Sequence, residues 1–258
     1  MVKFLFKLLR RKEKPVSSKL DSLRPLHNQK CLSDKRYAGL LFGSQEPNFI
    51  GQADLAKADV LICAGDGSDL TWKIISYGSS GGYVHAAVYV GNGYVVEATK
   101  DGVQKIELVK LINRYPYVAV VRCPGAHPDA LPDLAEKVVD FCLRHAEAKT
   151  PYNLAGALMA PIKELKQLRY ENITHLAYVP PPPKVSTPSL FCSELVIKAF
   201  IHGGFIKEGE MDAASLSPTA LAEDTTFINI GYLGNRDMAD RIYEQDHFMT
   251  GGIPRSAR

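Results

Sequence analysis

The sequence lacks any uninterrupted apolar run of the length that a membrane-spanning helix needs, about 18 residues or more. A strong excess of one charge is also missing, because the formal net charge of the 258 residues is only +3. A net charge this small gives no reason to expect a nucleic-acid partner. Hydrophobic residues make up 46% of the chain and charged residues 23%. These values exclude a wholly disordered or collagen-like chain, so we expect a globular protein without a transmembrane helix.

Cysteine is scarce and shows no pairing pattern. The five cysteines are an odd number, and no two of them form a CxxC motif. We therefore expect no disulfide framework and no Cys-rich zinc site, but reduced thiols in a cytosol-like compartment. Walker and dinucleotide-binding glycine motifs are missing too, so we predict no metal and no cofactor. At least four of the five should be inert core residues; the five are Cys31, Cys63, Cys123, Cys142 and Cys192.

Positive charge is concentrated at the N-terminus. Residues 1–36 carry a net charge of +8, which leaves −5 for the other 222 residues. Residues 1–14 place Phe and Leu before a basic cluster, the reverse of a secretory signal peptide. This pattern is typical of a short anchor on an anionic membrane, although a basic arm or a docked helix would share it. We expect a cytoplasmic protein that is peripheral at a membrane if residues 1–14 act as an anchor.

Composition divides the chain into three parts. Residues 1–52 read as the basic amphipathic head and a loosely ordered lead-in, residues 53–235 as the compact domain, and residues 236–258 as a polar C-terminal tail. In the domain, predicted strands precede predicted helices, which is typical of an α+β fold with an antiparallel sheet. The predicted strands are 58–64, 84–90, 94–98 and 117–123, and the predicted helices are 70–77, 131–146, 154–168 and 192–202.

Cys192 stands where a loop turns into an apolar helix. The free backbone N–H groups and the dipole at a helix N-terminus stabilise a thiolate, and the same N–H groups can hold a developing oxyanion. The position therefore suits a cysteine nucleophile. A buried structural cysteine at the start of the helix would satisfy the same pattern.

A nucleophilic cysteine needs a base and a group that orients the base. His85 begins one strand of a predicted hairpin, and Glu97 lies on the returning strand. A three-residue loop, Gly91-Asn92-Gly93, makes paired positions sum to an even number, so position 97 faces 87 and shares a side with His85. The turn thus favours contact between His85 and Glu97. A hydrogen-bonded structural histidine and a solvent-facing glutamate are the alternatives.

Four segments in order resemble the circularly permuted papain-like group of the NlpC-type superfamily, the YiiX- and YaeF-like proteins, with the lecithin–retinol acyltransferases as more distant relatives. Pro151-Tyr152-Asn153 resembles the family's Tyr-Asp element, and Ser217–Leu221 its Pro-x-x-Leu element. The chain departs from the family at Ala58, where Gly is usual, at Val84, where Ser is usual, and at Asn153, which replaces Asp. The four segments are Ala58–Leu61, Tyr83–Gly91, Val95–Thr99 and Phe191–Val196.

The resemblance implies a circularly permuted papain-like fold with a barrel-like antiparallel core packed by helices. It also implies Cys192 as the nucleophile, His85 as general base and then acid, and Glu97 as the residue that orients the imidazole. Tyr152 would line the pocket or donate to the oxyanion, although a plain core tyrosine would also fit. Small peptides or amides and lipid acyl esters are the implied substrates, for a hydrolase or for a phospholipid acyltransferase of the same fold.

Three other functions fit parts of the sequence. Residues 78–82 match G-x-S-x-G, but a serine nucleophile elbow needs a helix after it and a strand is predicted there. His85 and Cys192 could share a metal, although they have no short-spacing signature. A non-catalytic membrane-surface adaptor would use the basic head alone and would have no need of a reactive thiol.

Overall fold

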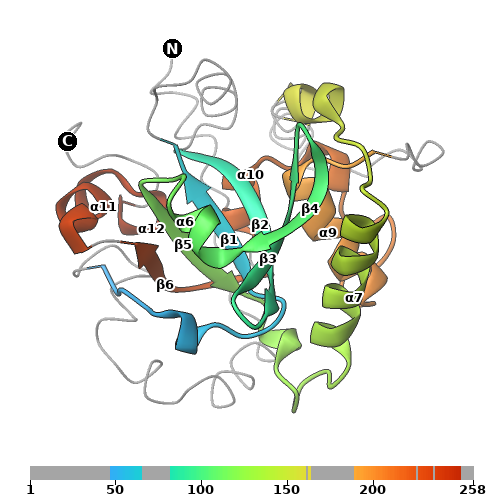
Figure 1. Cartoon of the computed structure of the whole chain (residues 1–258), viewed down its shortest axis with the longest axis horizontal. Coiled ribbons are helices and arrows are strands. Elements are labelled where there is room, and N and C mark those ends of the chain that lie inside the picture. Colours follow the sequence, from blue (N-terminus) through green and yellow to red (C-terminus); the bar gives the residue numbers. More distant parts are fainter. Residues whose placement is uncertain are drawn as a thin grey trace, which may run out of the picture.

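The computed structural model describes residues 47–65, 82–160, 162–163, 189–224, 226–234 and 236–250 (Figure 1). The basic segment 1–14, the helix predicted over 70–77 and all but the last residue of the G-x-S-x-G stretch lie outside these residues. Of the helix predicted over 154–168, residues 154–160 and 162–163 are described and are helical, whereas residues 161 and 164–168 lie outside. The described part is a mixed α+β arrangement of one antiparallel sheet and the helices packed on it, which confirms the predicted class.

Six strands form the sheet, in the order β4-β3-β2-β1-β5-β6, and every neighbouring pair is antiparallel. In the described residues the sheet is open between its edge strands β4 and β6, so of the expected antiparallel sheet or barrel-like core the structure shows the sheet. The strands are β1 (Val60–Ala64), β2 (Tyr83–Gly91), β3 (Tyr94–Thr99), β4 (Gly102–Glu107), β5 (Tyr117–Arg122) and β6 (Ile228–Gly234).

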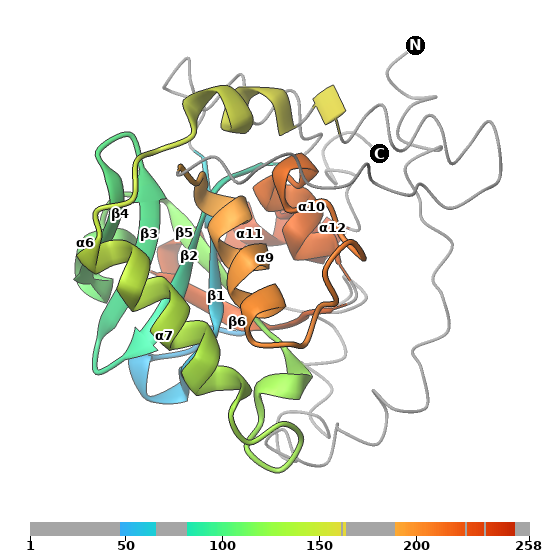
Figure 2. The ribbon, with the colours of Figure 1, turned by 90° about the vertical axis from the view of Figure 1, so that its right-hand side faces the viewer.

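The central strand β1 explains how the sheet is covered. All five of its side chains are buried, the pattern of a strand enclosed on both faces. Val60 and Ile62 pack into the cluster that α7, α9 and α10 complete, whereas Leu61 and Cys63 pack with α6 on the other face. Figure 2 shows α7 and α9 side by side on the sheet. The helices are α6 (Leu108–Ile112), α7 (Leu134–Glu147), α9 (Cys192–His202), α10 (Pro218–Glu223), α11 (Ala239–Gln245) and α12 (His247–Thr250), and the short 3-10 turns are Gln52–Asp54, Pro124–Ala126, Ala213–Ser215 and Arg236–Met238.

The β2–β3 hairpin has the predicted register but a different turn. Glu97 pairs with Ala87, as the even-sum rule requires. The loop, however, is the two-residue turn Asn92-Gly93, with φ of 54° and 77°, and a bulge between Tyr89 and Gly91 restores the register. Positive φ at both turn residues is what a type I′ turn needs. The bulge thus keeps position 97 on the side of the sheet that the three-residue loop predicts.

Residues 236–250 are part of the fold, unlike the polar tail that we expected over residues 236–258. Helices α11 and α12 bury Ile242 and Met249 in the larger core cluster. Between them, the buried carboxylate of Asp246 accepts hydrogen bonds of 2.6 Å from the hydroxyls of Tyr83 and Tyr232. The C-terminal helices are therefore tied to strands β2 and β6.

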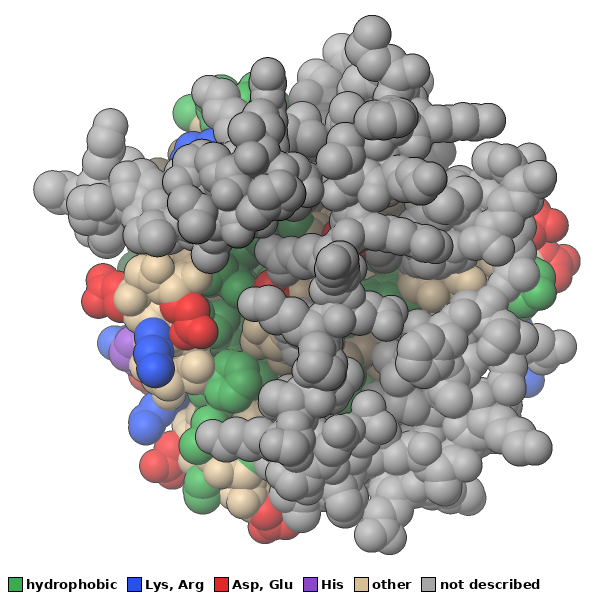
Figure 3. All heavy atoms as spheres, turned by 180° about the vertical axis from the view of Figure 1, so that it is seen from behind, with side chains coloured by type: hydrophobic (Ala, Val, Ile, Leu, Met, Phe, Trp, Pro, Cys, Tyr) green, Lys and Arg blue, Asp and Glu red, His purple; other side chains and the backbone are tan. Residues whose placement is uncertain are grey.

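Within the described residues, none of the helices is both long and apolar enough to cross a bilayer. On the part of the face that Figure 3 colours by side-chain type, acidic and basic side chains alternate instead of gathering into a patch of one sign.

Lys149 offers a test of the local backbone after α7. It is exposed and has a φ of 48°, the left-handed conformation that usually closes a helix with glycine. We expect Lys149→Gly to raise the free energy of unfolding by about 0.5–1 kcal/mol, since it removes the steric cost of a Cβ at positive φ. Urea unfolding measures the change. Ala148→Gly is the matched control: Ala148 is helical (φ −70°), so this variant should be destabilised, and a loss of stability in Lys149→Gly would contradict the prediction.

Candidate active site

Helix α9 presents Cys192 as its first residue, as predicted. The Cys192 side chain is 4% exposed, and the helix behind it is apolar and buried, which fixes the helix against the sheet. Two neighbouring side chains secure its first turn: the Ser193 hydroxyl donates to the Leu216 carbonyl at 2.5 Å, and Glu194 accepts from the Phe191 N–H at 3.4 Å. The sulfur is thus held at a helix N-terminus, where the dipole favours a negative charge.

His85 and Glu97 meet across the hairpin, as the register predicts. The Nε2 atom of His85 lies 2.9 Å from Oε2 of Glu97. His85 also has a side-chain hydrogen bond with Cys192. Since an imidazole has two ring nitrogens and Nε2 faces Glu97, Nδ1 is the one that faces the sulfur. The structure therefore brings together the three side chains that we identified in the sequence.

Three further side chains, which no sequence pattern indicates, surround the His85–Glu97 pair. On β4, the Gln104 amide donates to Oε1 of Glu97 at 3.0 Å. After α6, Arg114 donates to Oε2 of Glu97 at 2.6 Å, and the Tyr115 ring stacks on the His85 ring with centroids 5.8 Å apart. Each of these three residues contacts the pair from an element that is separate in the sequence. No local sequence pattern predicts such a contact, so only the fold identifies these residues.

The pKa shifts of these groups describe an ion pair. Burial alone would lower the pKa of His85, but the hydrogen bonds and negative charges of Cys192 and Glu97 raise it to about 9. Burial opposes a thiolate at Cys192, but His85 and the N–H groups of Ala86 and Ser193 outweigh it and lower its pKa. Burial would raise the pKa of Glu97, yet its cationic partners lower it to about 2. These shifts favour a thiolate paired with an imidazolium beside an ionised carboxylate, and the first two groups titrate as a pair.

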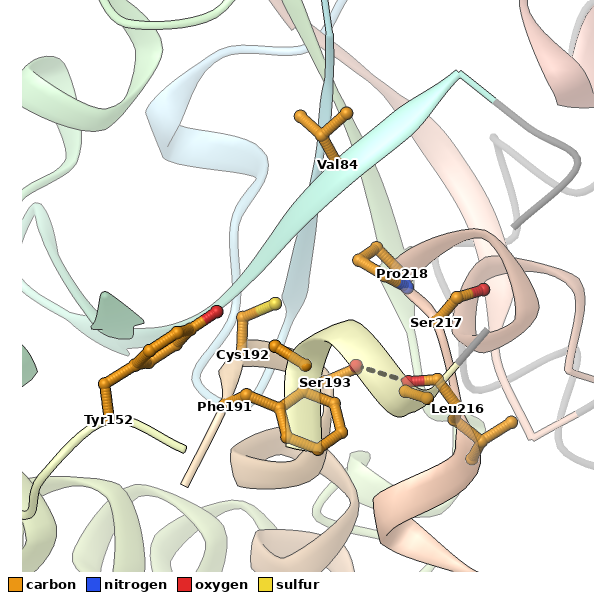
Figure 4. Close-up of a pocket in the computed structure, with 10 residues that line it drawn as sticks. Val84, Tyr152, Phe191, Cys192, Ser193, Leu216, Ser217 and Pro218 are labelled. Atoms are coloured by element: carbon orange, nitrogen blue, oxygen red, sulfur yellow. Dashed lines mark hydrogen bonds between the residues drawn. The ribbon is translucent and has the colours of Figure 1, made fainter. Parts of the chain in front are cut away.

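Tyr152 is brought beside Cys192 by a short parallel bridge. It pairs with Leu190, two residues before the cysteine. Figure 4 shows the Tyr152 hydroxyl pointing toward Cys192. Burial and the negative charge of Cys192 raise the pKa of the hydroxyl, so it stays protonated and able to donate. Asn153 begins the helical residues 154–160: its Oδ1 accepts from the Gly156 N–H at 2.8 Å.

A pocket opens over the sulfur. Its hollow measures about 260 Å³ and is open to solvent. Besides Cys192, it is lined by Val84, Tyr152, Ala157, Ala160, Phe191, Ser193, Leu216, Ser217 and Pro218. The site therefore combines a cysteine whose ionisation is favoured, an imidazole that can carry a proton, and hydrogen-bond donors beside a hollow open to solvent, which are components of acyl transfer through a covalent intermediate.

The other described cysteines have the opposite character. Burial raises the pKa of Cys123 to about 12 and raises the pKa of Cys63 and Cys142 as well. They behave as core side chains, as predicted, whereas Cys31 lies outside the described residues. In the part of the chain that the structure covers, no three His, Cys, Asp or Glu side chains come close enough to hold a metal ion.

Comparison with known proteins gives little further information. No protein-family model matches the chain, and no curated protein matches its sequence. Among solved structures, the chain is similar to the metalloprotein YiiX from Escherichia coli O157:H7 (DUF1105), with a TM-score of 0.39 and 16% identity. The match covers 67% of this chain and 94% of that one. A likeness this weak supports no functional conclusion.

The geometry predicts that Cys192 is the reactive thiol. An ordinary thiol is less than about 1% ionised at pH 6. Because the pKa of Cys192 is lowered, a larger fraction of it is thiolate at pH 6 than of an ordinary thiol, and this fraction falls as the pH drops through the lowered pKa. We expect iodoacetamide to label Cys192 at pH 6 at least about tenfold faster than any other cysteine, as measured by peptide mass spectrometry.

The matched controls are two histidine variants. His85→Ala should remove the advantage of Cys192 at pH 6, whereas His127→Ala, which changes a partly exposed histidine paired with Asp129, should preserve it. Labelling of native Cys192 at the rate of an ordinary thiol would refute the ion-pair description.

Proposed function

We propose that this chain is a cysteine-dependent hydrolase of an acyl ester or amide bond, built on a circularly permuted papain-like fold. The observation that carries the proposal is His85 held between the Glu97 carboxylate and the Cys192 sulfur. A histidine in this position can exchange a proton with a nucleophile on one side while a carboxylate orients it from the other. The chain order, with His and the acid before Cys, is the permuted order.

The proposed reaction proceeds in two steps. The Cys192 thiolate attacks the acyl carbonyl, a C–S bond forms, and the imidazolium of His85 gives its proton to the leaving amine or alcohol as the C–N or C–O bond breaks. Neutral His85 then takes a proton from water, the resulting hydroxide attacks the thioester, and the carboxylic acid leaves as the thiolate and imidazolium re-form. An alcohol or amine in place of water would make the same chemistry an acyl transfer.

Two sets of donors are available for the oxyanion. The N–H groups of the first turn of α9 have no partner within the helix, and the tyrosine hydroxyl of residue 152 faces the sulfur (Figure 4). In this proposal Tyr152 donates to the tetrahedral oxyanion, while Cys192, His85 and Glu97 carry the covalent and proton-transfer steps. Attachment to an anionic membrane through residues 1–14 remains a separate proposal, based on their sequence alone.

The first prediction of this function concerns the covalent step. With p-nitrophenyl acetate, the wild-type chain should release p-nitrophenol in a burst followed by turnover, and mass spectrometry should detect an acetyl group on Cys192. Cys192→Ala should lower the rate at least about 1000-fold, the scale of losing a nucleophile. Cys142→Ala, which alters a buried thiol on α7, should retain the burst. Acetylation elsewhere, or equal activity in Cys192→Ala, would refute the proposal.

A second prediction concerns Arg114, which acts through Glu97. Its guanidinium donates to the same oxygen that His85 contacts, so it competes for the carboxylate and repels the imidazolium. Arg114→Gln should therefore move the alkaline limit of kcat/KM, set by the His85 pKa of about 9, upward by about half a pH unit or more. The maximal rate should fall, because Glu97 loses one of the groups that orient it.

The pH profile separates this positioning role from a merely structural one. A structural defect would lower the rate at every pH and leave the alkaline limit where it is. Lys110→Gln is the matched control, since Lys110 is an exposed cation on α6 that pairs with Glu107. An unmoved alkaline limit in Arg114→Gln would show that the arginine has no influence on His85.

A further inference from the structure

The His85 side chain lies on the face of the sheet that α6 covers. In the register of β1 and β2, His85 pairs with Cys63, which belongs to the same core cluster as Leu111 of α6. Paired residues of neighbouring strands point to the same side of a sheet. The turn after α6 is held on this side, because Leu111 is fully buried and its carbonyl accepts the Arg114 N–H at 3.0 Å. The residue that follows in this turn is Tyr115.

Tyr115 covers the imidazole of His85 ring against ring. The two ring centroids are 5.8 Å apart, and the ring planes differ by 13°. Tyr115 is itself partly buried and packs against the core cluster beneath α6, which restrains its ring. The same ring lies 5.7 Å from the guanidinium carbon of Arg114. The two groups of the site that can carry positive charge are thus both within the distance, about 6 Å, at which an aromatic ring attracts a cation.

An aromatic cover acts on His85 differently from an aliphatic one. Burial opposes the imidazolium and is the largest single influence on the pKa of His85. An aliphatic side chain over the ring would add to that opposition, because it removes water and offers nothing in return. The face of an aromatic ring also excludes water, but its negative charge density attracts a cation. Tyr115 therefore shields the imidazole without disfavouring its charged form.

Tyr115 can influence the site only through its neighbours. Burial raises the pKa of its hydroxyl above the value of about 9 for His85, so the ring stays neutral while the imidazole titrates. Its attraction for a cation is therefore the same throughout that range of pH. Tyr115 is also not among the residues that line the pocket over Cys192, so it does not contact a substrate held there.

Building on the proposed hydrolase function, we propose that Tyr115 is a positioning residue of the reaction. Its ring holds the plane of the His85 imidazole, so that one nitrogen faces Glu97 while the other faces Cys192. The ring also stabilises the imidazolium that gives its proton to the leaving group. The aromatic face, and not the hydroxyl, is the part of Tyr115 that acts.

The test is the pH profile of kcat/KM for p-nitrophenyl acetate in two variants. Tyr115→Leu exchanges the aromatic cover for an aliphatic one. Its alkaline limit should move down by about half a pH unit, opposite to the shift expected for Arg114→Gln, because the imidazolium loses the attraction of the ring. The acid limit should stay, since His85 carries its proton on both sides of the Cys192 ionisation. Tyr115→Phe keeps the ring face and should keep both limits.

Tyr94 supplies the matched control. Its ring also contacts a cation, with Nζ of Lys105 4.5 Å from the ring centroid. It lies three positions before Glu97 on β3, so the two side chains point to opposite faces of the sheet. Tyr94→Leu should leave both limits where they are in the wild type. An unmoved alkaline limit in Tyr115→Leu, or an equal shift in Tyr115→Phe, would overturn the inference.

Failure of the inference and failure of the proposed function give different results. An acyl-enzyme burst in the wild type together with an unmoved alkaline limit in Tyr115→Leu refutes only the role of Tyr115. No burst in the wild type refutes the hydrolase itself and the inference with it. Rapid iodoacetamide labelling of Cys192 at pH 6 verifies that the site is intact in each variant, and Tyr115→Met provides a second aliphatic cover if the leucine variant does not fold.

Discussion

The buried carboxylate of Glu97 is the constraint on which the rest of the site depends. A fully buried carboxylate is costly unless charges and hydrogen bonds compensate it. Here the compensation comes from three different elements: His85 on β2, Gln104 on β4 and Arg114 after α6. A slip of one residue between β2 and β3 would turn Glu97 to the other face and separate it from all three partners. The bulge between Tyr89 and Gly91 therefore maintains both the register of the sheet and the contact between His85 and Glu97.

The second requirement is that a distant part of the chain meets this pair. Cys192 lies 107 residues after His85, so its position depends on how well α9 is fixed. The helix is buried on nearly every side, which prevents it from rotating, and the Ser193 hydroxyl ties its first turn to Leu216. Once placed, the sulfur gains the helix dipole and the imidazolium together, and these outweigh the burial that opposes its ionisation. Packing and electrostatics thus act on the same atom.

Local sequence patterns predict the three central residues of the site, Cys192, His85 and Glu97. They do not predict the residues that surround these three. Strand alternation with an even-sum register led to the pairing of His85 with Glu97, although that register comes from a bulge between Tyr89 and Gly91 and not from the predicted three-residue turn. A loop-to-helix boundary sufficed for Cys192. Arg114 and Tyr115 sit in a polar stretch whose role exists only because α6 folds back over the sheet. The C-terminal helices escaped prediction for a similar reason. Their segment is polar on average, and what attaches it is Asp246, whose tyrosine partners are remote in sequence. Long-range contacts of this kind produce no periodic pattern in the sequence.

Two of the positions where the sequence differs from the pattern that it resembles, Ala58 and Asn153, have physical explanations in this fold. Ala58 has a φ of 68°, a left-handed conformation in which glycine is the unstrained choice, and here the alanine methyl packs in the core. Asn153 uses its amide twice: its oxygen accepts from the Gly156 N–H, and its nitrogen donates to Glu194 at 3.4 Å. An aspartate could make only the first contact and would set a second carboxylate against Glu194. The asparagine thus satisfies the helix end without adding a negative charge beside Tyr152.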